Sequence, residues 1–138
     1  MLIGNVHFVR GRASDLESVL SLLRASGVEP SGNPDVYIRQ YGQFGIDEAR
    51  DLSEKASLRA VGQAQRFFLL CVDAMTAEAQ NALLKTLEEP PGNAAFIFIH
   101  PAPDMLLPTV RSRAQILNLV GREERRDEGM GFMKKLEI

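Results

Sequence analysis

Two uninterrupted apolar runs constrain the fold of this chain more than any other feature: FFLLCV at residues 67–72 and AAFIFI at residues 94–99. Each run has the length of a strand, and neither alternates between apolar and polar residues as a half-solvated strand would. Strands that are buried on both faces are typical of parallel sheets covered by helices on both sides. The two runs therefore predict an α/β fold built on a mostly parallel sheet.

Segments with the pattern of helices separate these runs from other short apolar stretches. Ser14 and Glu17 have the spacing of a capping box, and Gly27 is a typical helix stop. Thr76 is the expected N-cap of a helix whose buried face carries Leu83 and Leu87. We predict strands at 6–9, 35–41, 67–72, 94–99 and 114–120, helices at 14–27, 46–58 and 76–89, and at 103–113 a short helix or turn broken at Pro108.

Five strands with intervening helices predict one α/β domain over residues 1–120. Residues 121–129, GREERRDEG, carry charges of both signs and no core residues. Residues 121–138 are therefore expected to form a charged tail or a short helix.

Composition excludes several classes of protein. The chain has 138 residues, 45% of them hydrophobic and 25% charged, as a single soluble domain would. Its net charge of −2 argues against nucleic-acid binding over the whole surface. The one cysteine, Cys71, cannot form a disulfide framework or a cysteine-rich zinc site, and we expect no bound metal. No stretch looks like a signal peptide or a membrane span, so a cytoplasmic location is expected.

Three motifs follow one another along the chain: FGIDEARDLSEKASL at 44–58, TAEAQNALLKTLEEPPG at 76–92 and PDMLLPTVRSR at 103–113. In this order and at these separations they resemble the AAA+ core of bacterial clamp-loader subunits, in particular the delta-prime type of DNA polymerase III subunit. AQNALLKTLEEPP is the most specific part. The resemblance implies a three-layer fold of the P-loop NTPase type with a five-stranded sheet.

The first departure from this family concerns the phosphate-binding loop. Such a loop needs several glycines, a lysine for the phosphate charge and a serine or threonine for magnesium. The corresponding segment, VRGRAS at 9–14, has the single glycine Gly11 and no lysine, and the sequence contains no Gly-Lys pair. Arg10 and Arg12 could attract an anion, and the helix start at Ser14 could hold one. We nevertheless expect no bound nucleotide, no cofactor and no P-loop hydrolysis.

The second departure concerns the acidic pair that holds magnesium and orients water. Counted back from Asn81, the family's Asp-Glu pair falls on Leu70 and Cys71; with a shortened loop, Asp73 and Ala74 take its place. Either alternative leaves magnesium at most one ligand. A third position agrees with this interpretation. Where the family places a threonine or serine that senses the γ-phosphate, this chain has His100, expected to be a loop histidine.

The resemblance leaves Arg113 as the residue with a catalytic role. VRSR resembles the family's Ser-Arg-Cys motif, with Ala114 in place of cysteine. In clamp loaders this arginine reaches the ATP of a neighbouring subunit and supplies positive charge in trans. We expect Arg113 to lie at the domain edge, near the start of the last strand, with its guanidinium solvated. Arg111 lies two residues away and could share the work.

The function implied is that of a non-hydrolysing, delta-prime-like interaction subunit of a clamp loader. Its partners would be motor subunits of the gamma/tau type, together with the delta subunit or the sliding clamp; DNA would be contacted only indirectly and a membrane not at all. Two alternatives stay open: an AAA+-derived scaffold outside the clamp loader, and an α/β enzyme with an unrecognised ligand. The chain ends at Ile138, and we expect it to lack the family's helical lid, collar and four-cysteine zinc module.

Overall fold

A computed structural model describes residues 5–58 and 65–119, and the predicted tail at 121–138 lies outside them. The described residues form one five-stranded sheet in the order β2-β3-β4-β1-β5, and every neighbouring pair of strands is parallel. The parallel sheet predicted from the sequence is confirmed. The strands are β1 (Val6–Arg10), β2 (Val36–Phe44), β3 (Arg66–Met75), β4 (Ala94–His100) and β5 (Gln115–Asn118).

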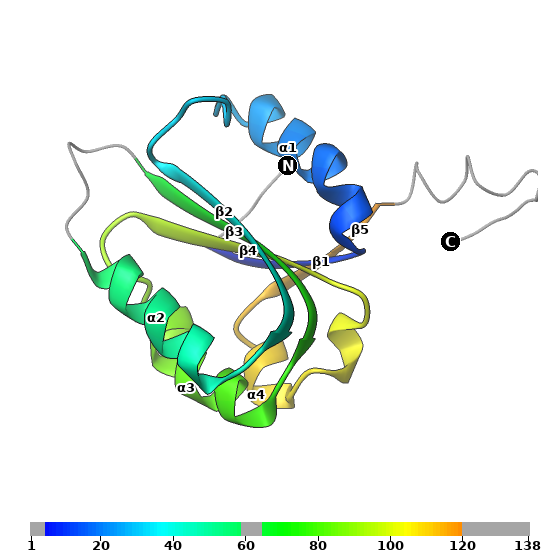
Figure 1. Cartoon of the computed structure of the whole chain (residues 1–138), viewed down its shortest axis with the longest axis vertical. Coiled ribbons are helices and arrows are strands. Elements are labelled where there is room, and N and C mark those ends of the chain that lie inside the picture. Colours follow the sequence, from blue (N-terminus) through cyan, green and yellow to red (C-terminus); the bar gives the residue numbers. More distant parts are fainter. Residues whose placement is uncertain (1–4, 59–64, 120–138) are drawn as a thin grey trace, which may run out of the picture.

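Helices cover both faces of this sheet, which makes three layers. Figure 1 shows α1 on one face and α2, α3 and α4 on the other. Within the described part of the chain, no helix is both long and apolar enough to cross a bilayer. The α-helices are α1 (Leu16–Ala25), α2 (Ile46–Ser57), α3 (Ala77–Glu88) and α4 (Pro108–Arg111), with 3-10 helices η1 (Ala13–Asp15) and η2 (Pro103–Met105).

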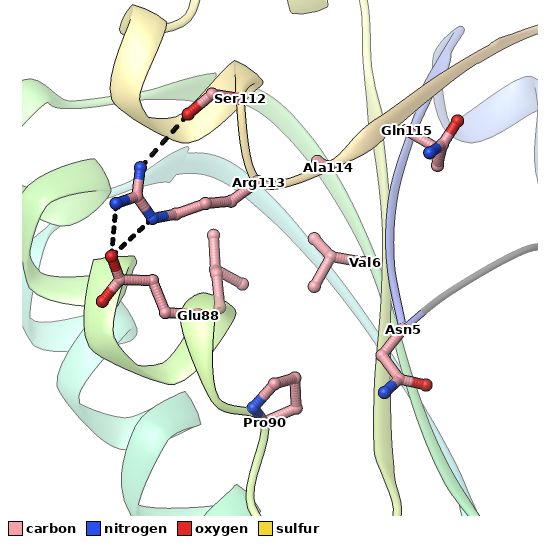
Figure 2. Close-up of a pocket in the computed structure, with 9 residues that line it drawn as sticks. Asn5, Val6, Glu88, Pro90, Ser112, Arg113, Ala114 and Gln115 are labelled. Atoms are coloured by element: carbon pink, nitrogen blue, oxygen red, sulfur yellow. Dashed lines mark hydrogen bonds and ion pairs between the residues drawn. The ribbon is translucent and has the colours of Figure 1, made fainter.

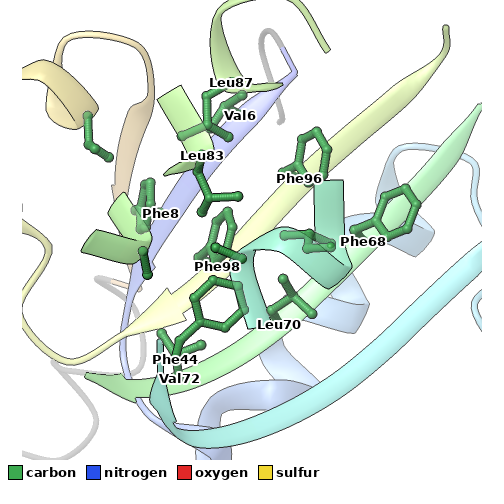
Figure 3. Packing of buried hydrophobic residues seen from close by; sticks show 14 of the residues in the cluster. Val6, Phe8, Phe44, Phe68, Leu70, Val72, Leu83, Leu87, Phe96 and Phe98 are labelled. Atoms are coloured by element: carbon green, nitrogen blue, oxygen red, sulfur yellow. The ribbon is translucent and has the colours of Figure 1, made fainter. Parts of the chain in front are cut away.

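The core consists of two apolar layers, one on each side of the sheet. Phe8, Phe98 and Leu83 are fully buried between the sheet and α3, as Figure 3 shows. On the opposite face, Ile97 and Leu23 belong to the layer beneath α1. Because successive strand residues point to opposite faces, β3 and β4 need apolar residues at consecutive positions. This explains the two uninterrupted runs.

The start of α1 differs from the prediction. A capping box between Ser14 and Glu17 does not form; η1 precedes the helix instead. The carboxylate of Asp15 accepts a hydrogen bond from the backbone N–H of Arg12 at 2.9 Å. The predicted stop at Gly27 is confirmed, since this residue has a φ of 91°, a conformation that glycine adopts without strain.

The boundaries of α3 follow the prediction, whereas the predicted helix break at Pro108 is wrong. The hydroxyl of Thr76 accepts a hydrogen bond from the Ala79 N–H at 3.0 Å, so Thr76 is the N-cap. Thr76 is also the whole connection between β3 and α3. Pro108 was predicted to break a helix but is the first residue of α4. Proline is tolerated there because the first N–H of a helix has no intrahelical partner.

Candidate functional site

The strand order creates a switch point between β1 and β4. From β1 the chain continues to β2 at one edge of the sheet, whereas from β4 it continues past β1 to β5 at the other edge. In open α/β sheets, ligands bind at the carboxyl ends of strands at such a point. Here Gly11 follows β1 and His100 ends β4, and the Gly11 N–H donates a hydrogen bond to the His100 carbonyl at 3.0 Å.

The side chain of Asp15 lies against the segment after β1 that was compared with a phosphate-binding loop. Asp15 is buried and lies so close to Gly11 that a Cβ atom there would be 2.5 Å from the Asp15 Oδ2 atom. The same oxygen accepts the Arg12 N–H, as described above. The Asp15 carboxylate thus accepts a backbone N–H that a bound phosphate would otherwise use. Ser14, which was expected to open the first helix, lies in η1 and is exposed.

Arg10, at the same end of the sheet, connects β1 to β5 and η2. Its Nε donates to Asn118 Oδ1 at 2.9 Å, and its Nη1 donates to Asp104 Oδ1 at 2.8 Å. The hydrogen bond from Arg10 lowers the pKa of Asp104. Arg10 is therefore engaged with protein groups at the switch point.

His100 was expected to be a loop histidine, but it is the last residue of β4. The residue is buried at 6% exposure, and its Nδ1 accepts the Ala102 N–H at 3.0 Å. An acceptor Nδ1 requires the neutral ring. Burial lowers the pKa of His100, and the nearby Asp104 opposes that shift only in part. His100 thus shapes the turn after β4.

The residues compared with the family's Asp-Glu pair lie at different depths in β3. Leu70 and Cys71 are buried in the strand, paired with Phe98 and Ile99 of β4. Burial, together with the charge of Asp73, raises the pKa of the Cys71 thiol. Asp73 is exposed near the carboxyl end of β3, which extends to Met75 rather than ending at 72 as predicted. Asp73 thus lies within β3, and only Thr76 separates this strand from α3.

A cavity of about 250 Å³ adjoins Asp73, with Ala13, Gln40, Tyr41 and Cys71 among its lining residues. Asp73 is the one carboxylate in this lining. Over residues 5–58 and 65–119, no three histidine, cysteine, aspartate or glutamate side chains cluster as metal ligands. The cavity therefore offers a cation a single charged ligand.

Arg113 lies at the opposite end of the sheet. It precedes β5, whose Gln115 pairs with His7 near the start of β1, whereas Gly11 follows the end of β1. The five residues of β1 separate these two ends by roughly 16 Å at about 3.3 Å per residue. Arg113 and the phosphate-loop position of the same chain are thus on different sides of the domain.

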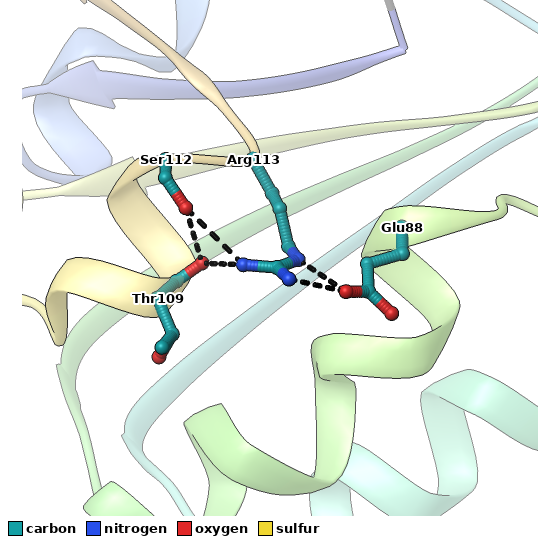
Figure 4. Close-up of polar contacts among 4 residues, drawn as sticks. All are labelled: Glu88, Thr109, Ser112 and Arg113. Carbon is teal, nitrogen blue, oxygen red and sulfur yellow. Dashed lines mark hydrogen bonds and ion pairs between the residues drawn. The ribbon is translucent and has the colours of Figure 1, made fainter.

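The guanidinium of Arg113 is held by protein groups, which corrects the expectation that it is solvated. Its Nε donates to Glu88 Oε2 at 2.7 Å, and its Nη2 forms an ion pair with the same oxygen (Figure 4). Its Nη1 donates to the Thr109 carbonyl at 2.7 Å and to the Ser112 hydroxyl at 3.1 Å. The side chains of Arg113 and Glu88 are 32% and 46% exposed, so the pair lies at the surface.

This ion pair lines a cavity of about 340 Å³ at the amino ends of the strands (Figure 2). Asn5, Pro90 and Gln115 contribute to the same lining. Arg111 takes no part in it, because its Nε donates to the Leu106 carbonyl at 3.1 Å. The two arginines therefore do not converge on one position.

Glu88 is the site residue that the sequence analysis missed. One signal was present: an acid in the last turn of a helix is unfavourable against the negative end of the helix dipole. Glu88 is the last residue of α3, so a nearby cation was to be expected. Which residue supplies that cation depends on how α3 and α4 pack against each other.

Comparisons with known proteins were consistent with one another. The family model described as "DNA polymerase III, delta subunit" matches residues 10–122. DNA polymerase III subunit delta' of Bacillus subtilis is 32% identical over 112 residues, which are 79% of this chain and 33% of that protein. Subunit delta' of Escherichia coli K12 is 36% identical over 89 residues, 61% of this chain and 27% of that protein.

Further similarities concern gamma-type subunits. DNA polymerase III subunit gamma/tau of Mycobacterium tuberculosis H37Rv is 41% identical over 70 residues, 50% of this chain and 12% of that protein. A gamma subunit-related protein of Thermotoga maritima has a similar fold, with a TM-score of 0.64 at 24% identity over 83% of this chain and 41% of that chain. The chain spans no more than about a third of the curated relatives named here.

Proposed function

The chain belongs to the DNA polymerase III delta-subunit family, and from this membership we propose that it is a delta-prime-type clamp-loader subunit that acts in DNA replication. In this role it does not hydrolyse ATP itself. It presents Arg113 to ATP held by a neighbouring motor subunit of the gamma/tau type. The delta subunit and the sliding clamp are further partners, and DNA is contacted only through the assembly.

The observation that carries the proposal is the separation of Arg113 from the chain's own switch point. The two lie at opposite ends of the sheet, which are separated by the length of β1, roughly 16 Å. An arginine at this distance cannot serve a phosphate bound after β1 of its own chain. A planar guanidinium at a surface cavity suits phosphate oxygens that another subunit brings to it.

The environment of Gly11 supports the absence of hydrolysis. The buried Asp15 carboxylate places negative charge where a phosphate would need N–H donors. The sequence supplies no lysine at this loop to offset that charge. Arg10, the cation at the end of β1, is engaged by Asp104 and Asn118.

The test is ATP hydrolysis by a reconstituted complex of this chain with a motor subunit. Arg113→Ala should lower the partner's rate at least about 10-fold, since arginine fingers contribute 10³–10⁵ in the strongest cases. Arg50→Ala removes the same charge from an exposed position on α2 and should leave the rate unchanged. An unchanged rate with Arg113→Ala, in a complex that still forms, would refute the finger role.

One observation favours the scaffold alternative as a second candidate function. Arg113 joins α3 to the end of α4 through Glu88 and Thr109, as an arginine with a purely structural role would. In that case Arg113→Ala should lower the stability of this chain and leave the partner's hydrolysis unaffected. Unfolding and hydrolysis measured on the same variant therefore separate the two functions.

A further inference from the structure

Every nitrogen of the Arg113 guanidinium already has an acceptor in this chain. Nε and Nη2 both point to one oxygen of Glu88, and Nη1 points to the Thr109 carbonyl and the Ser112 hydroxyl. The Nε–Nη2 edge is one of the two forks with which arginine binds phosphate or carboxylate oxygens. A phosphate that used this fork would have to take the place of Glu88.

Glu88 is poorly placed for the stability of its own helix. It is the final residue of α3, and Glu89 follows it directly. Two adjacent carboxylates at the negative end of a helix are destabilising unless a cation compensates them. For Glu88, Arg113 is that cation, and the two residues are 25 positions apart in the sequence.

The pair is exposed enough to exchange partners. Glu88 is 46% exposed, and both residues line the cavity of about 340 Å³, together with Asn5 and Gln115. Partly exposed ion pairs are weak, because water and salt compete with them. A dianionic phosphate group that enters this cavity can therefore compete with a single carboxylate.

We propose that Glu88 is a resident anion on Arg113, which a phosphate group from a neighbouring subunit displaces when the interface forms. Glu88 thereby lowers the apparent affinity of Arg113 for phosphate. This inference rests on the proposed function for its biological setting. Its chemical content, competition between a carboxylate and a phosphate for one guanidinium fork, can be tested on the chain alone.

The first experiment titrates the isolated chain with tripolyphosphate and follows the Nε–H resonance of Arg113 by NMR, assigned by its loss in Arg113→Ala. The variants are Glu88→Gln and the matched control Glu89→Gln, which removes the same charge from the next residue. Glu88→Gln should bind tripolyphosphate about 3-fold more tightly than Glu89→Gln, a ratio within the range for partly exposed ion pairs. Equal affinities, or weaker binding by Glu88→Gln, would overturn the proposal.

The second experiment uses the reconstituted complex. Glu88→Gln should lower the concentration of this chain that half-maximally stimulates the partner's ATP hydrolysis by about 3-fold. A maximal rate as low as that of Arg113→Ala would overturn the proposal, because Glu88 would then hold the finger in its working position. If Arg113→Ala itself has no effect, the proposed function fails, and the phosphate titration still decides whether Glu88 competes for the fork.

Discussion

His100 is a buried side chain that stabilises the turn after β4. Its buried ring accepts the Ala102 N–H through Nδ1. That hydrogen bond exists only while Nδ1 carries no proton. The turn that leads from β4 to η2 therefore depends on the neutral form of this histidine.

Protonation of His100 should destabilise the fold. Burial lowers the folded-state pKa below 6.5, so the unfolded chain binds the proton more readily. The stabilisation is complete above about pH 6.5 and is lost as the pH falls through the lowered pKa. Urea unfolding at a series of pH values measures this slope. His100→Asn keeps an acceptor at nearly the same place without titrating there, and its slope should be smaller.

Gly11 should be intolerant of a side chain. An added Cβ would lie 2.5 Å from the Asp15 carboxylate, which would have to move away from the Arg12 N–H. We expect Gly11→Ala to reduce the free energy of unfolding by about 1–3 kcal/mol, the usual cost of overpacking. Gly42→Ala is the control, because nothing lies within 4 Å of the place that its Cβ atom would take. Equal effects of the two substitutions in denaturant unfolding would contradict this explanation.

At the scale of elements, α3 should contribute stability through one apolar stripe. Leu83 has no exposed surface and belongs to the core layer that contains Phe8 and Phe98. Leu83→Ala should cost on the order of 2–5 kcal/mol because it leaves a cavity. Asn81→Ala, on the exposed side of α3, should change the stability by less than about 0.5 kcal/mol. A similarly small loss for Leu83→Ala would show that this helix face is not part of the core.

The sequence did not predict features that depend on which residues of neighbouring strands pair with one another. The apolar runs located β3 and β4, but β3 continues to Met75 because Ala74 and Met75 pair with Gln43 and Phe44 of β2. No local pattern encodes that register. The end of β3 was therefore placed too early, and with it the surroundings of Asp73.

The same limit applies to polar contacts between elements. The apolar stripe of α3 was visible in the sequence, but Gln80 was not marked as buried. Its amide binds the Met75 carbonyl at 3.2 Å and the Leu107 N–H at 2.7 Å, which ties β3 to the residue before α4. The position of Arg113 before the last strand was predicted correctly. Its ion pair with Glu88 was not, since the acid at the end of α3 indicates a nearby cation but not which residue supplies it.

At the scale of the whole molecule, the sheet separates two ends with different chemistry. At the carboxyl ends of β1 and β4, Asp15, His100 and Arg10 are hydrogen-bonded to other groups of the chain, next to the cavity that Ala13 and Asp73 line. The amino end beside β5 carries a surface cavity with an arginine. Because all strands of a parallel sheet run in the same direction, their amino ends all lie at one edge and their carboxyl ends at the other. Small movements of the chain therefore cannot bring the arginine at the amino end to the carboxyl end.

The groups at the carboxyl ends of the strands lead to a prediction about nucleotide binding. We expect the isolated chain to bind ATP with magnesium more weakly than a dissociation constant of about 10 μM, equivalent to roughly −7 kcal/mol, and not to hydrolyse it. The buried Asp15 carboxylate repels phosphate at the loop, and Asp73 alone is too few ligands to hold magnesium. Calorimetric titration measures the affinity, with an ATP-binding motor subunit as the positive control. Binding tighter than about 10 μM that is lost on a substitution beside Gly11 would mean that the Asp15 carboxylate gives way to phosphate, and the switch point would then be a working nucleotide site.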